Sequence, residues 1–176
     1  MRVNRSRMQG LYDEASQAET TMTRVALHDV SNPATVRRQL QTAFDTSLRG
    51  HESTEQLIKR IQHVADVSRA RAATIAQTEK TRAANSARVA SAMKEYLEAY
   101  DKAVKNHSKR PEPPMMQWVN PRAAREPRPH HVAISGTIKP VGDEFFPGLR
   151  YPGDPQGPAH EVINCHCYVR KIKGVG

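Results

Sequence analysis

The longest helical pattern in the sequence runs from Ser68 to about Asn106 and contains neither glycine nor proline. Apolar residues recur along it at spacings of three, four or their sums, which is the spacing of one face of an α-helix. This apolar stripe consists of Ala72, Ile75, Val89, Met93, Leu97, Tyr100 and Val104. We therefore predict one long helix as the largest element of the fold.

The predicted long helix has a polar interruption in its apolar stripe. Glu79, Arg82 and Ser86 stand where apolar residues are expected. Charged side chains are rarely buried without a partner, and Glu79 and Arg82 have the i, i+3 spacing that allows pairing. Thr78 and Asn85 are suited to complete a small polar network. We favour a buried network with a structural role over the alternative, a helix face turned to solvent.

Two shorter helices are predicted before the long one. Ser31-Asn32-Pro33 offers N-caps and a first-turn proline, and Gly50 ends the pattern that follows. Ser53 and Gln56 have the spacing of a capping box, which opens the second helix. The apolar faces comprise Val36, Leu40, Phe44 and Leu48 in the first helix and Leu57, Ile58, Ile61 and Val64 in the second. Residues 1–30 are polar and weakly patterned, so we expect a loosely ordered or partner-dependent helical arm there.

The sequence changes character after the helical region, residues 31–110. Residues 111–114 form a proline-rich linker that can neither continue a helix nor pair within a central strand. Residues 115–176 hold most of the prolines and glycines, and turn signals separate short apolar runs at 115–119, 132–134, 138–141 and 167–172. The sequence thus predicts an α+β fold, in which an extended N-terminal helical arm of two shorter helices and one long helix precedes a small loop-rich β module.

Composition argues against one large core and against a membrane span. Hydrophobic residues make up 38% of the chain and aromatic residues 5%, and the mean hydropathy is -0.70. This supply suits helices with narrow apolar stripes. No stretch approaches the roughly 18 consecutive apolar residues of a membrane helix. The N-terminus has no apolar export segment, so we expect a cytoplasmic protein that is later built into something larger.

The chain is strongly basic, with a formal net charge of +9 and a pI of about 9.9. The excess of lysine and arginine is spread along the sequence and forms no polybasic tract. Spread positive charge suits contact with DNA that does not depend on base sequence. The alternative is a solvated basic surface, and composition alone does not separate the two.

Candidate metal ligands gather in the predicted β module. Two thiolates one residue apart, Cys165 and Cys167, point to the same side of an extended strand and can share one ion, whereas a disulfide between them would close a small, strained ring. With His131, and with His160 or Asp154 as the fourth ligand, they would form a tetrahedral structural zinc site. The alternative is two buried cysteines packed as small hydrophobes, with His131 held by hydrogen bonds.

Enzyme motifs are scarce. The sequence has no glycine-rich phosphate loop, no His-Glu-x-x-His and no Gly-x-Ser-x-Gly. His130-His131 with Asn164 and His166 invites comparison with His-Asn-His nucleases, but those enzymes separate the asparagine and the final histidine more widely. We therefore expect no catalytic residues. The alternatives to a structural protein are a soluble nucleic-acid-binding module with a structural zinc and a metal-dependent nuclease.

Several segments resemble the Mu F-like family of phage head-morphogenesis proteins. Residues 75–88 are similar to the family segment Ala-x-Thr-Glu-x-Thr-Arg-Ala, and residues 128–136 resemble Arg-x-x-His-x4-Gly, which places the family histidine at His131. Trp118 precedes the second segment, and Phe145 or Phe146, the turn Tyr151-Pro-Gly-Asp-Pro155 and Ile163-Asn-Cys-His-Cys167 follow it in the family's order. One departure is His166, which stands where arginine is usual.

The resemblance implies a minor capsid protein, present in few copies and bound to the portal inside the head. Such a protein contributes to head assembly and to DNA retention or delivery. The implied partners are the portal protein, packaged DNA bound without sequence specificity and, as a further contact, the scaffold or major capsid protein, with no membrane involved. The implied locations are the virion interior near the portal and, during assembly, the host cytoplasm. The resemblance assigns no catalytic residues.

Overall fold

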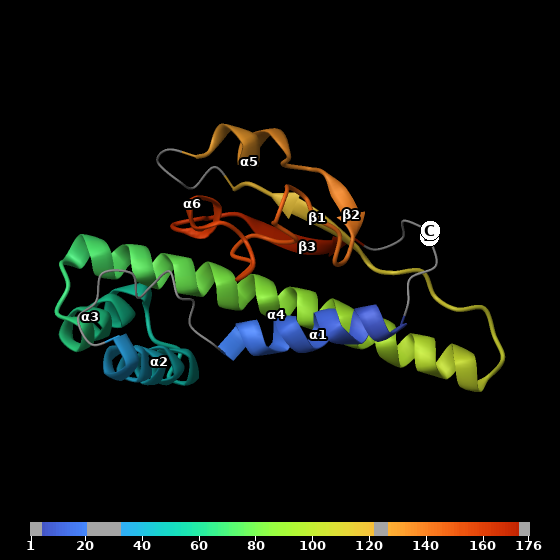
Figure 1. Cartoon of the computed structure of the whole chain (residues 1–176), viewed down its shortest axis with the longest axis horizontal. Helices are drawn as coiled ribbons and strands as arrows, with labels where there is room; N and C mark the ends of the chain where they lie inside the picture. The colour runs from blue at the N-terminus through green and yellow to red at the C-terminus, as the bar shows by residue number, and fades with distance from the viewer. Residues whose placement is uncertain (1–4, 21–32, 122–126, 173–176) are drawn as a thin grey trace.

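The computed structural model describes residues 5–20, 33–121 and 127–172. Its elements in chain order are α1 (Arg5–Thr20), α2 (Pro33–Arg49), α3 (Thr54–Ala65), α4 (Arg69–Lys105), β1 (Met115–Val119), α5 (Pro129–Ala133), β2 (Ile138–Pro140), α6 (Ala159–Val162) and β3 (Tyr168–Ile172). Helix α4 lies along the length of the molecule, with α2 and α3 at its start, and both the sheet and α1 lie alongside its later part (Figure 1). The predicted α+β fold is confirmed.

Helix α4 confirms the predicted long helix. Ser68 caps its start, since the Ser68 hydroxyl accepts a hydrogen bond from the Arg71 amide (3.2 Å), and Asn106 follows its last residue. At 1.5 Å per residue the helix is about 55 Å long. The apolar stripe is shorter than predicted, because Val104 is 48% exposed near the C-terminal end of the helix.

Helices α2 and α3 pack against the first half of α4. The predicted capping box is present: the Ser53 hydroxyl accepts a hydrogen bond from the Gln56 amide (3.3 Å), and the Gln56 side chain accepts one from the Ser53 amide (2.8 Å). Leu48 was expected on the apolar face but is 44% exposed, and the predicted caps at 31–32 lie outside the described residues. The three helices share a cluster, here called the three-helix core, formed by Leu40, Phe44, Leu57, Ile58, Ile61, Ala72, Ile75, Ala76 and Ala83.

The expectation of a loosely ordered arm is wrong for residues 5–20, which form α1 packed along α4; the rest of 1–30 lies outside the described residues. Met8 and Ala15 are each 1% exposed, and Leu11 and Tyr12 pack beside them. The guanidinium of Arg5 also makes two hydrogen bonds to the Asp101 carboxylate, at 2.6 and 2.7 Å. The apolar positions of α1 thus have helical spacing, although the polar residues around them hide it.

The β module contains a three-stranded antiparallel sheet in the order β2-β1-β3. In its register Met115 pairs with Ile172, Val119 with Tyr168, and Met116 with Lys139. Three of the four predicted apolar runs overlap these strands. The fourth, 132–134, overlaps the short helix α5 instead, because Pro129 at the first turn favours a helical start.

A second cluster, the module core, joins the β module to α1 and to the second half of α4. Its members include Met8, Val89, Met93, Leu97, Trp118, Leu149, Cys165, Cys167 and Val169. The linker at 111–114 therefore connects two parts that share one core. None of the helices in the described part of the chain is long and apolar enough to cross a membrane.

The module approaches the backbone of α4 closely at Gly153, in the turn that follows Tyr151. Its φ is +77°, and a Cβ atom placed there would lie 2.8 Å from the Cα atom and 3.0 Å from the amide nitrogen of Arg82. Any larger residue would thus both strain the turn and push the module away from the helix.

We expect Gly153→Ala to destabilise the protein more than Gly136→Ala, by about 1–3 kcal/mol in urea unfolding followed by circular dichroism. Gly136 is a matched control, since its φ is also positive (+94°) but a Cβ there meets no atom within 4 Å. Equal losses of unfolding free energy in the two variants would show that the contact with α4 does not contribute to stability.

Candidate functional site

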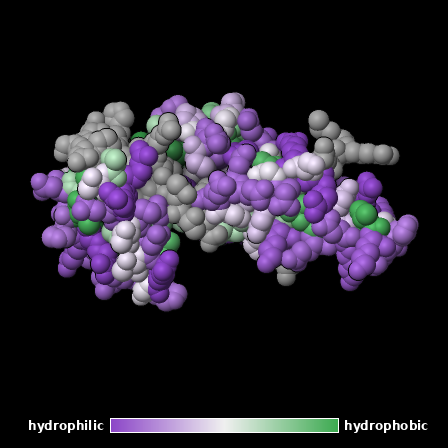
Figure 2. Space-filling model, turned by 60° about the horizontal axis from the view of Figure 1, so that its bottom comes forward, coloured by the Kyte–Doolittle hydropathy of each residue, from purple (hydrophilic) through white to green (hydrophobic). Residues whose placement is uncertain are grey.

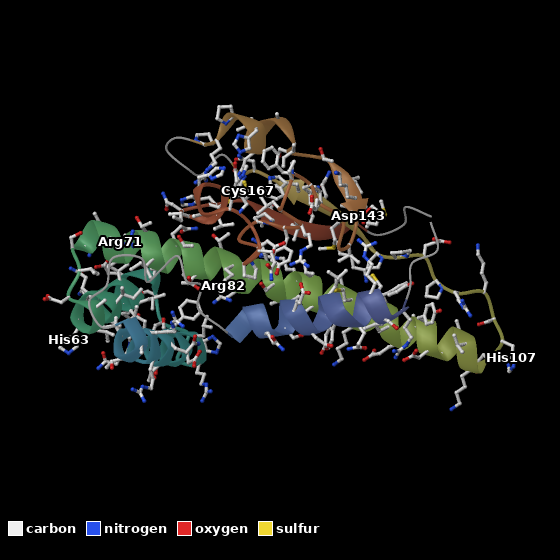
Figure 3. The ribbon with its side chains drawn as sticks, in the orientation of Figure 1. His63, Arg71, Arg82, His107, Asp143 and Cys167 are labelled. Carbon is white, nitrogen blue, oxygen red and sulfur yellow. The ribbon has the colours of Figure 1, made fainter. Side chains whose placement is uncertain are left out.

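The structure brings together three of the predicted metal ligands, His131, Cys165 and Cys167. His131 lies on α5, and the two cysteines lie in the segment between α6 and β3. The sulfur atoms of Cys165 and Cys167 each lie 3.7 Å from Nδ1 of His131. All three side chains are buried, and both cysteines belong to the module core. Figure 3 shows Cys167 in the module, above α4.

Glu161 orients the histidine of this cluster. Its Oε2 atom lies 2.9 Å from Nε2 of His131 and 2.6 Å from Nε2 of His130. Burial opposes ionisation of Glu161, but the hydrogen bond from His130 and the charges of both histidines outweigh it, so the pKa of Glu161 is lowered. The ionised carboxylate can only accept, so Nε2 of His131 is a donor. In the neutral ring, the lone pair of Nδ1 then faces the two sulfur atoms.

The two thiols behave as a coupled pair. The hydrogen bond with Cys167 lowers the pKa of Cys165 to about 5, against the effect of burial, and His131 contributes to the lowering. The pKa of Cys167 is raised, first by that same hydrogen bond and then by burial. Each sulfur atom thus alters the ionisation of the other.

The structure does not bring His160 or Asp154, the two predicted fourth ligands, into the cluster. The exposed imidazole of His160 lies 3.2 Å from the other oxygen of Glu161. Asp154 is fully buried and accepts hydrogen bonds from the Arg150 guanidinium (2.8 and 3.0 Å) and from the Gln156 amide (3.0 Å). Asp154 thus holds the turn around Gly153, which is a structural role.

The buried ion pair predicted on α4 is present. Nε of Arg82 lies 2.7 Å from Oε2 of Glu79, and both side chains are fully buried. Within the described residues, Nη1 and Nη2 of Arg82 have no hydrogen-bond partner. The carboxylate of Glu79 is therefore the main compensation for burying the guanidinium charge.

Asn85 extends this polar stretch into the β module. Its Nδ2 donates to the carbonyl oxygens of Pro152 and Cys167, each at 3.1 Å, and its Oδ1 accepts from the Val169 amide at 3.0 Å. One side chain thereby satisfies backbone groups of two separate module segments. The predicted participation of Asn85 in a structural network is confirmed.

Threonines one and two turns earlier make equivalent contacts. The Thr81 hydroxyl donates to the carbonyl oxygen of Cys165 at 2.6 Å, and the Thr78 hydroxyl accepts from the Asn164 amide at 2.9 Å. Asn164 has a positive φ of 53°, so this contact also supports an unfavourable backbone conformation next to the cysteines. The polar face of α4 therefore positions the segment that carries both sulfur atoms.

Sequence reasoning missed Glu161, although it lies near both the histidine pair and the cysteine motif in space. It comes from α6, a helix of a single turn with no apolar periodicity, so no sequence pattern linked it to His131. The role of Trp118 was also missed: its ring lies edge-on to His131, with centroids 5.1 Å apart. A lone tryptophan in a chain with 5% aromatic residues was the available signal.

The fold and the site define an α+β protein in which the polar face of one long helix holds a small β module. The sequence model of the family described as Phage Mu protein F like protein matches residues 38–170, which include the polar stretch of α4, His131 and both cysteines. The chain therefore belongs to this family and is a phage head morphogenesis protein, a component of the virion. No curated protein and no solved structure matches it.

We expect Glu79→Gln to destabilise the protein by about 3–5 kcal/mol, because Arg82 would remain buried without a countercharge. The double variant Glu79→Leu with Arg82→Met removes both charges and should be far less destabilised than the single variant. Urea unfolding of the three proteins tests this. A double variant as unstable as the single one would mean that packing, and not charge compensation, sets the cost.

We expect Asn85→Asp to cost at least about 3 kcal/mol, because a carboxylate would face carbonyl oxygens where the amide now donates. Gln39→Glu makes the same amide-to-acid change at an exposed position of α2 and should cost no more than about 0.5 kcal/mol. Thermal melting of both variants provides the comparison. Similar melting temperatures would contradict the assigned role of Asn85.

Proposed function

We propose that this head protein is a minor capsid component that binds the portal inside the head and contacts the packaged DNA without sequence specificity. Membership in the Phage Mu protein F like family supports the general role. The finer assignment rests on how charge and shape are distributed along α4. It also entails that the protein is not an enzyme, in keeping with the structural character of the family.

The main support is a basic tip at the C-terminal end of α4, defined here as residues 102–110. Its exposed cations are Lys102, Lys105, Lys109 and Arg110. Figure 3 shows His107 of this tip at the extreme end of the molecule, beyond the β module. The neighbouring Asp101 is already paired with Arg5, so it does not neutralise the tip. Projecting lysines and arginines of this kind bind phosphates by displacing counterions.

The opposite end of the molecule offers a different surface. Helices α2 and α3 enclose a groove of about 460 Å³, lined by Arg38, Gln39, Thr42, Ala43, Thr46, Arg60, His63 and Val64. Figure 1 shows these helices at the far end of α4 from the tip. Ala43 and Val64 give this lining an apolar part among polar and basic side chains, and a mixed composition is usual for a protein-binding surface. We assign this α2–α3 groove to the portal.

The surface between these two ends is mostly hydrophilic on the face shown in Figure 2, which is the side opposite the β module. A hydrophilic flank is compatible with exposure to solvent between DNA and portal. The molecule would then span the distance between the two partners along α4, which is about 55 Å long.

We expect the triple variant Lys102→Gln, Lys105→Gln, Lys109→Gln to bind duplex DNA more weakly and with a smaller salt dependence. Each lost phosphate contact should reduce the slope of log K against log salt by roughly 0.9, or about 3 in total. The variant should bind the cognate portal ring as the wild type does at about 0.15 M salt. Fluorescence anisotropy measures DNA binding as a function of salt, and pull-down with portal rings measures portal binding.

The matched control is Arg37→Gln, Arg38→Gln, Lys59→Gln on α2 and α3, which removes the same charge at the other end. It should leave the DNA salt slope unchanged and weaken portal binding, since Arg38 lines the groove. Equal loss of DNA affinity in both variants would contradict a localised DNA contact. Failure of the wild type to bind the portal, or magnesium-dependent cleavage of the DNA, would overturn the proposed function.

A further inference from the structure

We propose that His131, Cys165 and Cys167 bind one zinc ion, which fastens α5 to the segment before β3. The site is independent of the portal and DNA assignments. Nδ1 of His131 and the two sulfur atoms lie within 4.8 Å of one another, and the three residues are 2%, 2% and 5% exposed.

The distances between the ligand atoms fit a metal ion. Zinc–sulfur bonds of about 2.3 Å and zinc–nitrogen bonds of about 2.0–2.1 Å, at a tetrahedral angle, separate sulfur from nitrogen by about 3.6 Å. Each sulfur lies 3.7 Å from Nδ1 of His131. A thiol–imidazole hydrogen bond also allows this distance, so the assignment rests on all three buried ligand atoms lying within 4.8 Å of one another.

The surrounding residues prepare the histidine as a ligand. The Glu161 carboxylate holds Nε2 of His131 as a donor, at 2.9 Å, and this leaves Nδ1 as the metal-binding atom. A carboxylate behind a histidine in this way fixes the ring orientation and raises its basicity as a ligand. The indole N–H of Trp118, beside the His131 ring, is buried and faces the Cys167 thiol. Metal-bound thiolates commonly accept such hydrogen bonds.

The ligand set selects the type of metal. Two thiolates and one imidazole favour zinc over magnesium or calcium, which prefer oxygen ligands. The described part of the chain offers these three residues as a group and no fourth His, Cys, Asp or Glu within it. The fourth position of the tetrahedron would then be left to a water molecule. The ion would join residues more than thirty positions apart in a small module, where a metal can replace a larger apolar core.

Cobalt(II) is the probe for the test, because its spectrum reports both thiolate ligation and tetrahedral geometry. We expect the full chain, freed of metal under reducing conditions, to bind one equivalent of cobalt with thiolate-to-metal charge-transfer bands, and zinc to displace it. Glu161→Gln should weaken binding roughly 10–100-fold while the bands persist. His107→Ala, a histidine on the basic tip, should bind as the wild type does.

Cys165→Ser and Cys167→Ser should each lose about half of the charge-transfer intensity and bind cobalt at least roughly 100-fold more weakly. Circular dichroism shows whether these variants fold. If they do not, the cobalt spectrum of the wild type and the cobalt affinity of Glu161→Gln test the proposal. Less than a tenth of an equivalent bound by the wild type would overturn the proposal. Undiminished cobalt binding by the double variant Cys165→Ser, Cys167→Ser would also overturn it.

Discussion

The polar stretch of α4 is the feature on which the rest of the structure depends. Besides β3, loops of the module pack against the helix, and several of their buried amide and carbonyl groups have no strand partners to bond with. Thr78, Thr81 and Asn85 supply those partners from the helix. An apolar stripe at the same positions would leave these groups unsatisfied, at a cost of about 1–3 kcal/mol each. Polar residues here thus hold the module in place where an apolar surface could not.

Much of the helical part was predictable, because local signals decide it. The capping box at Ser53 and Gln56 and the absence of glycine and proline from 69–105 act within a few residues of themselves. The pairing of Glu79 with Arg82 was also predictable from one helical turn of spacing. A helical arm was expected at α1, but its packing on α4 was not, because four apolar positions among polar neighbours make a weak pattern.

The site was predictable only in part. Cys165 and Cys167 are close in sequence, and a family motif points to His131, so those three residues could be chosen before the structure was known. Glu161 was missed, and His160 and Asp154 lie outside the cluster, because the distance between a residue and the cysteines depends on how the loops of the module fold. A buried aspartate beside an arginine looks the same in sequence whether it binds a metal or, as Asp154 does, closes a turn.

The long helix belongs to both cores, with Ile75 and Ala76 in the three-helix core and Val89 and Met93 in the module core. If one core unfolds, it exposes its part of α4, while the other core still holds the rest of that helix in place. The two ends of the molecule are therefore coupled cooperatively, although they share few direct contacts. The centre of α4 should be the last part of the backbone to exchange its amide hydrogens with solvent.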